Sequence, residues 1–144
     1  MSTVTKKAFY AKLAADATLL ALIGSDELGG PAIFNASMNR VAQGTGWSFP
    51  AITFREADGA NDQRLRSETV DREFYDVEVW AEGESALTVG QIAGRIETLL
   101  HNQSLTVDSG EVYDCSRVTQ SPDMYDDKLN LHFGLYRYQL VVRR

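Results

Sequence analysis

The chain has 144 residues, a length that predicts one globular domain spanning residues 1–144 whose core needs no covalent cross-links. Its hydrophobic content of 44% and charged content of 24% are those of an ordinary globular protein, and its single cysteine, Cys115, excludes an internal disulfide. The formal net charge of −6 argues against a protein that binds nucleic acid through a basic surface.

The N-terminal segment has no pattern of a signal peptide. Residues 8–15 include Lys12 and lead directly to Asp16, so an apolar h-region is missing. The sequence also has no run of about 18 apolar residues, which a membrane-spanning helix needs. We therefore expect a cytoplasmic protein that does not contact a membrane.

A helix is predicted over residues 5–23. Its apolar residues recur at close to 3.6 residues per turn, at Phe9, Leu13, Ala17 and Leu20. Asp16 can cap a second helix over residues 17–23, which would bend the segment at that point. Gly24 has the residue type that commonly ends a helix.

Two short strands are predicted next, over residues 31–34 and 49–54. Pro50 lacks an N–H group, so it fits the first residues of a strand or an edge position. Between these strands, residues 35–46 are compatible with a loop or with a weak helix. Residues 55–71 are polar and charged, and a polar stretch of this length inside a domain is usually functional or mobile.

Residues 73–80 predict a half-buried strand. Apolar and acidic side chains alternate along it, with Tyr75, Val77 and Val79 on one face and Asp76 and Glu78 on the other. A hairpin with residues 49–54 would place the polar stretch at its tip.

The strongest helix signal begins at Ser85, a good N-cap residue. The apolar positions that follow keep the helical period: Val89, Ile92, Ala93, Ile96, Leu99 and Leu100. Gly90 and Gly94 lie inside this helix, where each costs about 1 kcal/mol relative to alanine. Their bare backbone would allow another element to approach closely.

A hairpin with a three-residue loop is predicted from residues 105–107 and 111–119, followed by a polar loop over residues 121–127. The last strand covers residues 129–142. Its apolar residues change parity after Gly134, and we interpret this change as a β-bulge that exchanges the two faces of the strand. One face would then serve the core and the other a partner.

This order of elements predicts an α+β fold, with an antiparallel or mixed β-sheet and two main helices packed on one face.

Catalytic and metal-binding patterns are missing from the sequence. A Gly-rich phosphate loop and a nucleophile elbow do not occur, and a triad or a nucleophilic Cys115 would need His101 or His132 as base. The acidic clusters at 58–62 and 123–127 do not fit a calcium loop, and cysteine and histidine do not have zinc spacing. We therefore expect no enzyme activity, no cofactor and no metal.

The candidate interface residues are aromatic side chains and two arginines of the polar stretch. Aromatic rings favour either core packing or an anchor in a protein interface, and arginines are either solvated or paired with carboxylates of a neighbour. The candidates are Trp47, Arg64, Arg66, Tyr136 and Tyr138.

The order of several sequence patches carries a resemblance to a known family. These patches are residues 19–24 (LLALIG), 33–34 (IF), 49–54 (FPAITF), 75–80 (YDVEVW), the helix ending at 99–100 (LL), and 136–140 (YRYQL). In this order the chain resembles the tail-completion and tail-terminator (tail-to-head joining) proteins of long-tailed bacteriophages and of related prophages or gene-transfer agents.

The resemblance implies a structural virion protein of the tail or neck, assembled in the host cytoplasm. It implies a homo-hexameric ring that caps the tail tube and meets the head-tail connector or a neck protein. DNA would pass through the lumen without sequence-specific binding. A tail terminator and a neck adaptor remain open as alternatives within this family.

A ring requires that one patch of the chain meets a different patch of the next copy. The candidate patches are residues 55–71 and the far half of the last strand. Two other functions remain open: a module that binds a small ligand or peptide in an apolar pocket between helix and sheet, and an enzyme whose ionisable groups meet in a cleft.

Overall fold

The computed structural model describes residues 2–57, 72–82, 86–108 and 110–142. The elements follow one another in this order: α1 (Ser2–Ala14), α2 (Ala17–Leu20), β1 (Ile33–Phe34), α3 (Met38–Val41), β2 (Ala51–Glu56), β3 (Arg72–Glu82), α4 (Ala86–Leu100), β4 (Gln103–Thr106), β5 (Val112–Asp126) and β6 (Leu131–Val142).

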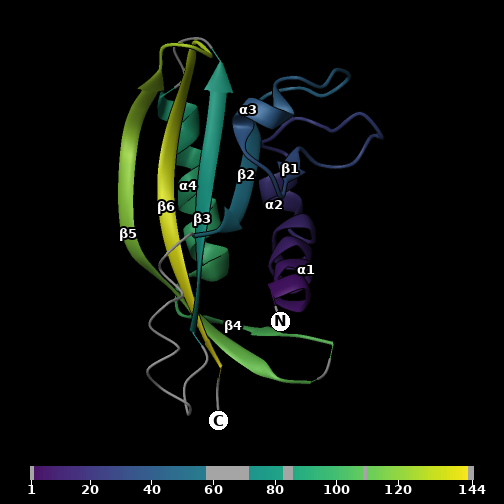
Figure 1. The fold of residues 1–144 in the computed structure, drawn as a ribbon, viewed down its shortest axis with the longest axis vertical. Coiled ribbons are helices and arrows are strands. Elements are labelled where there is room, and N and C mark those ends of the chain that lie inside the picture. Colours follow the sequence, from purple (N-terminus) through teal and green to yellow (C-terminus); the bar gives the residue numbers. More distant parts are fainter. Residues whose placement is uncertain (1, 58–71, 83–85, 109, 143–144) are drawn as a thin grey trace.

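The strands form one six-stranded sheet in the order β1-β2-β3-β6-β5-β4. Strand β1 is parallel to β2, and all other neighbours are antiparallel, so the sheet is mixed. Figure 1 shows β3, β6 and β5 as long, curved strands with α4 behind them. The prediction of an α+β fold with a mixed sheet is confirmed.

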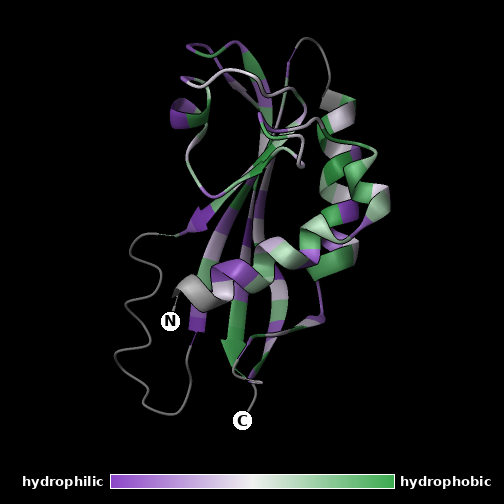
Figure 2. Ribbon diagram, turned by 90° about the vertical axis from the view of Figure 1, so that its right-hand side faces the viewer, coloured by the Kyte–Doolittle hydropathy of each residue, from purple (hydrophilic) through white to green (hydrophobic). Residues whose placement is uncertain are grey.

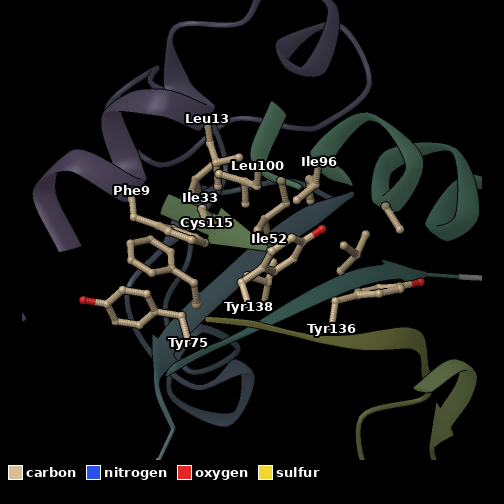
Figure 3. Packing of buried hydrophobic residues seen from close by; sticks show 14 of the residues in the cluster. Phe9, Leu13, Ile33, Ile52, Tyr75, Ile96, Leu100, Cys115, Tyr136 and Tyr138 are labelled. Carbon is tan, nitrogen blue, oxygen red and sulfur yellow. The ribbon is translucent and has the colours of Figure 1, made fainter. Parts of the chain in front are cut away.

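Helices α1 and α4 pack on the same face of the sheet and enclose the main core. Phe9 of α1 is fully buried, and its ring centroid lies 5.3 Å from that of Phe54 and 5.1 Å from that of Tyr75. Figure 3 shows Tyr75, Tyr138 and Tyr136 together with Ile96 and Leu100 of α4 in this core. Figure 2 shows α4 beside the strands, with hydrophobic residues along it.

The start of α1 is tied to β3 by buried hydrogen bonds. The hydroxyl of Thr5 donates to Oε1 of Glu73 at 2.7 Å, and the hydroxyl of Tyr75 donates to the same oxygen at 3.1 Å. All three side chains are fully buried. A buried carboxylate needs such donors, because burial removes its water.

The predicted bend at Asp16 is confirmed. The Oδ2 atom of Asp16 accepts a hydrogen bond from the backbone N–H of Leu19 at 2.8 Å and so caps α2. Arg95 of α4 donates to both carboxylate oxygens, from Nε at 2.8 Å and from Nη2 at 2.7 Å. The hydrogen bonds from Arg95 are the main reason why the pKa of Asp16 is lowered to about 2. One side chain therefore joins the α1–α2 junction to α4.

Gly24 is needed for a close approach and does not cap α2, which ends at Leu20. The backbone N–H of Gly24 donates to the carbonyl of Pro50 at 2.8 Å. A Cβ at this position would collide with the backbone carbonyl of Ser48. A side chain here would therefore separate the loop after α2 from the segment that enters β2.

A second apolar cluster covers part of the other face of the sheet. The chain between α2 and β2, including the short helix α3, folds over this face, where the rings of Trp80 and Phe133 stack at 4.3 Å. Helix α3 resolves the segment that the sequence left undecided between loop and helix. The buried members of the cluster are Ala32, Met38, Val41, Ala51, Trp80 and Leu131.

This second cluster explains the parity change in β6, and the bulge predicted after Gly134 is wrong. The register between β3 and β6 runs without interruption from Glu82↔Leu131 to Arg72↔Val141. The first half of β6 buries Leu131 in the second cluster, and its later part buries Tyr136, Tyr138 and Leu140 under the helices. The buried parity changes because the covering layer changes sides.

The irregularities of the sheet lie on β5. This strand continues through Asp126, so the loop predicted for residues 121–127 is wrong over most of its length. Its register to β6 shifts between Arg117 and Thr119 and between Ser121 and Met124. Polar side chains and Pro122 hid this strand in the sequence, because an exposed edge needs no apolar alternation.

Candidate interaction surfaces

The face of the sheet away from α1 and α4 is polar at its centre. Arg137 and Asp76 lie opposite each other on β6 and β3, and Arg137 donates from Nε to Oδ1 at 2.8 Å and from Nη2 to Oδ2 at 3.2 Å. Beside them, Thr53 accepts from the Trp80 indole N–H at 3.1 Å and donates to Glu78 at 3.2 Å. Burial is the main cause that raises the pKa of Glu78. These side chains already satisfy one another within the chain.

The outer face of α4 has a different character, because none of its exposed residues in the described part of the helix is charged. The exposed positions are Leu87, Gly90, Gln91, Gly94 and Thr98. Leu87 is 77% exposed and lies on this face together with the two glycines. A solvent-facing helix normally presents charges here.

The charged residues that flank this face are paired inside the chain. Arg95 forms an ion pair with Asp16, and Glu97 forms an ion pair with Arg117, whose Nη2 atom lies 3.2 Å from the carboxylate. Each pair neutralises a charge that would otherwise point along the edge of the face. The outer face of α4 is thus both uncharged and bordered by compensated charges.

A groove of about 230 Å³ runs between the outer face of α4 and the neighbouring strands. Gly90 and Gly94 form one side, while Pro122 of β5 and Tyr136 of β6 contribute to the other. No atom lies within 4 Å of the position that a Cβ would take at Gly90 or Gly94. The close approach expected at these glycines is therefore not made by the described part of the chain itself.

A rigid turn over residues 25–31 presents the most exposed large hydrophobic residue of the described chain. Leu28 at its tip is 90% exposed. The Oδ1 atom of Asp26 accepts from the backbone N–H groups of Leu28 at 2.9 Å and Gly30 at 2.8 Å, and the backbone of Asp26 also donates to the Gly30 carbonyl at 2.8 Å. Gly29 has φ +87°, which the turn requires and which glycine adopts without strain.

The predicted interface residues occupy different environments. Trp47 is half-buried, packs against Phe34 and Phe49, and donates from its indole N–H to the carbonyl of Gly44 at 3.3 Å. Tyr138 is 1% exposed and Tyr136 is 4% exposed, so both rings belong to the core of the chain. Burial is the main cause that raises the pKa of both tyrosines.

Two further predicted interface residues, Arg64 and Arg66, lie outside the described residues, as does the acidic cluster at 58–62. The contact of all five residues with a partner stays a prediction.

The sequence predicts a polar, glycine-rich loop over residues 25–30, but neither this loop nor the uncharged face of α4 was expected to be an interaction surface. The signal for the turn is Asp26 followed by Gly29 and Gly30, because an aspartate can bond the backbone two residues later and glycine permits positive φ. The signal for the α4 face is the lack of charge at the positions opposite its apolar stripe.

The side chains of Cys115, His101 and His132 are buried or engaged in contacts within the chain. Cys115 is 1% exposed, and burial raises the pKa of its thiol to about 12. The Nδ1 atom of His101 accepts from the backbone N–H of Arg117 at 3.0 Å, and His132 packs edge-on against Tyr125. Among the described residues, histidine, cysteine and acidic side chains form no group that suits a metal ion.

None of the helices that the structure describes is both long and apolar enough to cross a membrane.

Comparison with known proteins identifies a family. The family model for "Tail completion protein gp17" matches residues 7–143. A solved structure from the "Virion of native gene transfer agent (GTA) particle" matches with a TM-score of 0.72 at 16% identity, over 98% of this chain and 96% of that chain.

A second solved structure matches with a TM-score of 0.62 at 14% identity, over 100% of this chain and 96% of that chain. These two likenesses show a shared fold. No curated protein matches the chain at a significant level by sequence.

Proposed function

This chain belongs to the tail completion protein gp17 family, whose members are structural virion proteins and not enzymes, and on that premise we propose that it caps the tail tube as a ring and joins the tail to the head. The chain is a structural protein of a phage-type tail and a component of the virion. Its work is to associate with other tail or head proteins.

The extent of the family match supports the proposal that the chain caps the tail tube and joins it to the head. The match includes almost every described element from α1 to β6. The fold shared with a chain of the gene transfer agent virion over 98% of this chain also supports it. A match over the full fold favours the role in assembly that the family has.

A closed ring of six copies is the oligomer that we propose. Such a ring needs a heterologous interface, in which a patch of one copy meets a different patch of the next. The described part of the chain offers two unlike surfaces of this kind, the uncharged outer face of α4 and the turn with Leu28 at its tip. Both present apolar side chains without a partner among the described residues.

The proposed neighbours of the ring are the tail tube protein on one side and the head-tail connector or a neck protein on the other. We propose that it assembles in the host cytoplasm and stays in the tail or neck of the particle. The net charge of −6 suits a ring through which DNA passes without being held. A tail terminator and a neck adaptor both form ring-shaped joints. The identity of the partner on the tube side of the ring therefore distinguishes these two roles.

The space between the helices and the central strands β2, β3 and β6 is filled by side chains such as Phe9, Ile52 and Tyr138, as Figure 3 shows. A small-ligand module would need an apolar pocket at this place. The packing therefore favours the assembly function over ligand binding.

The test combines the purified protein with tubes assembled from the cognate tail tube protein. Native mass spectrometry over a concentration series, with negative-stain imaging, should show six-fold rings alone or six-fold caps at one end of each tube. A control with tubes of an unrelated phage should show no caps. A protein that stays monomeric and leaves both tube ends bare would contradict the proposal.

A further inference from the structure

The two glycines of α4 weaken the helix without serving the fold of the described chain. Glycine is less favourable than alanine in a helix interior. At both Gly90 and Gly94, the space where a Cβ would stand is open for 4 Å. Glycines inside a helix usually allow another element of the same chain to approach closely. Among the described residues no element does so here, and such a contact therefore does not explain why these two positions are glycine.

The surroundings of the glycines match the centre of a protein interface. Charged residues are depleted at the core of interfaces, and the exposed positions of α4 from Leu87 to Thr98 have none. The nearest charged side chains, Arg95 and Glu97, are already paired with Asp16 and Arg117. An apolar side chain can therefore enter the groove without removing an unpaired charge from water.

The size of the groove suits one aliphatic side chain. Its volume is about 230 Å³, and a cavity of about 150 Å³ is enough to hold benzene, which is larger than the side chain of leucine. Pro122 and the nearly buried ring of Tyr136 line the side opposite the glycines, and the polar side chains of Glu97, Arg117 and Gln120 complete the lining.

The described chain has a protrusion that fits, which is Leu28 on the turn at residues 25–31. The hydrogen bonds of Asp26 hold this turn in one conformation, so docking it costs little conformational entropy. Glu27, which is exposed beside Leu28, is complementary in charge to Arg117 at the rim of the groove. Arg117 uses Nη2 for Glu97, and a guanidinium has further N–H donors that can bind a second carboxylate.

The turn and the groove cannot meet within one chain. Figure 1 shows the turn projecting to the right of β1, while β5, which lines the groove with α4, lies on the opposite side of the sheet. A contact between these patches therefore joins two copies head to tail, which is the geometry that closes into a ring.

We infer that Leu28 of one copy inserts into the groove beside Gly90 and Gly94 of the next copy. This inference rests on the proposed ring and names its interface. The occupant of the groove is thus a second copy of this chain.

The test uses the double substitution Gly90→Ala with Gly94→Ala in the full chain. Because alanine favours the helix and meets no neighbour, the melting temperature of the monomer should rise, by about 2–4 °C for each substitution. Because the two methyl groups fill the groove, the protein concentration at which half of the chains form rings should rise by about 10-fold or more. A gain in stability together with a loss of assembly is the expected result.

Matched variants separate the contact from general effects. Thr18→Ala changes an exposed residue of α2 away from the groove, so it should leave ring formation unchanged. Leu28→Ser should weaken assembly as strongly as the double alanine variant, and Leu28→Met, which keeps an apolar tip, should assemble nearly as the parent chain does. Normal assembly of the double alanine variant or of Leu28→Ser would overturn the inference.

Disulfide trapping gives a second readout. A chain with Leu28→Cys and Gly94→Cys should form a ladder of covalent oligomers on mild oxidation, because each contact joins the two unlike positions. Dimers from Gly94→Cys alone would show instead that two α4 helices meet face to face, and would overturn the inference. If the parent chain itself forms no ring or cap, the proposed function fails as well, whereas rings that ignore these substitutions disprove the interface only.

Discussion

The ring of Tyr136 lies across the backbone of Gly134, two residues earlier on the same face of β6. A Cβ added at Gly134 would stand 2.5 Å from the phenol oxygen and 2.8 Å from Cε2 of Tyr136. Residues i and i+2 of a strand share a face, so a side chain at 134 would compete with this ring for the space under α4. The glycine thus lets a large side chain lie flat in the core.

Gly134→Ala should therefore destabilise the protein by about 1–3 kcal/mol, because Tyr136 would have to leave its position in a filled core. Urea unfolding followed by circular dichroism measures this loss. Gly94→Ala, on an open helix face, is the matched control and should stabilise. Equal effects of both substitutions would show that the contact with Tyr136 is unimportant.

Phe9→Ala should cost about 3–5 kcal/mol, because Phe9 is fully buried between Phe54 and Tyr75 and its removal leaves a cavity. Thermal unfolding of the variant should show a much lower transition temperature. Phe9→Leu, which keeps part of the volume, should lose less. A loss below about 1 kcal/mol for Phe9→Ala would contradict the packing of α1 on this face.

The pair of Asp16 and Arg95 should make stability depend on pH below about 4. Hydrogen bonds from Arg95 lower the pKa of Asp16 in the folded protein from its ordinary value of 3.8 to about 2, so the ionised form is favoured in the folded state. Its contribution is fully present above the unfolded pKa and disappears as the pH falls through the folded pKa. Urea midpoints measured from pH 5 to pH 2 should therefore fall for the parent chain.

Arg95→Gln is the control for this pH dependence. The variant should be less stable at pH 7 and should lose less of its remaining stability between pH 4 and pH 2, because Asp16 then titrates more nearly as it does in the unfolded chain. Parallel curves for the parent chain and the variant would refute the assignment of this dependence to the pair.

Cys115 should be unreactive in the folded protein. The thiol is buried and its pKa is raised to about 12, so at pH 8 almost none of it is the nucleophilic thiolate. Labelling with a chromogenic disulfide at pH 8 should be slow in buffer and fast in concentrated urea. Rapid labelling of the folded protein would mean that the strand containing Cys115 opens to solvent.

The local pattern of the sequence was enough to predict most of the individual helices and strands. The helical period with an aspartate in its middle predicts α1, α2 and the bend at Asp16, and strict alternation predicts β3. Each of these signals is contained within a few neighbouring residues, because a helix or strand that buries one face repeats its apolar residues at a fixed spacing.

The predictions that are wrong over the longest segments concern residues whose contacts are decided by parts of the chain that are distant in sequence. The parity change at Gly134 has the same local signature whether a strand bulges or the covering layer changes sides, and the stack of Trp80 on Phe133 shows the second case. The side-chain pattern predicts a loop at the end of β5, because the polar residues there pair with β6 through backbone hydrogen bonds that leave no pattern in the side chains.

The sequence by itself determined the α+β class, the order of the main elements and the resemblance to tail-completion proteins, since these depend on periodicity and on the order of patches along the chain. Only the tertiary structure decided which surfaces remain without a partner, namely the outer face of α4 and Leu28. Whether a side chain is covered depends on segments far away in the sequence, and folding alone brings those segments together.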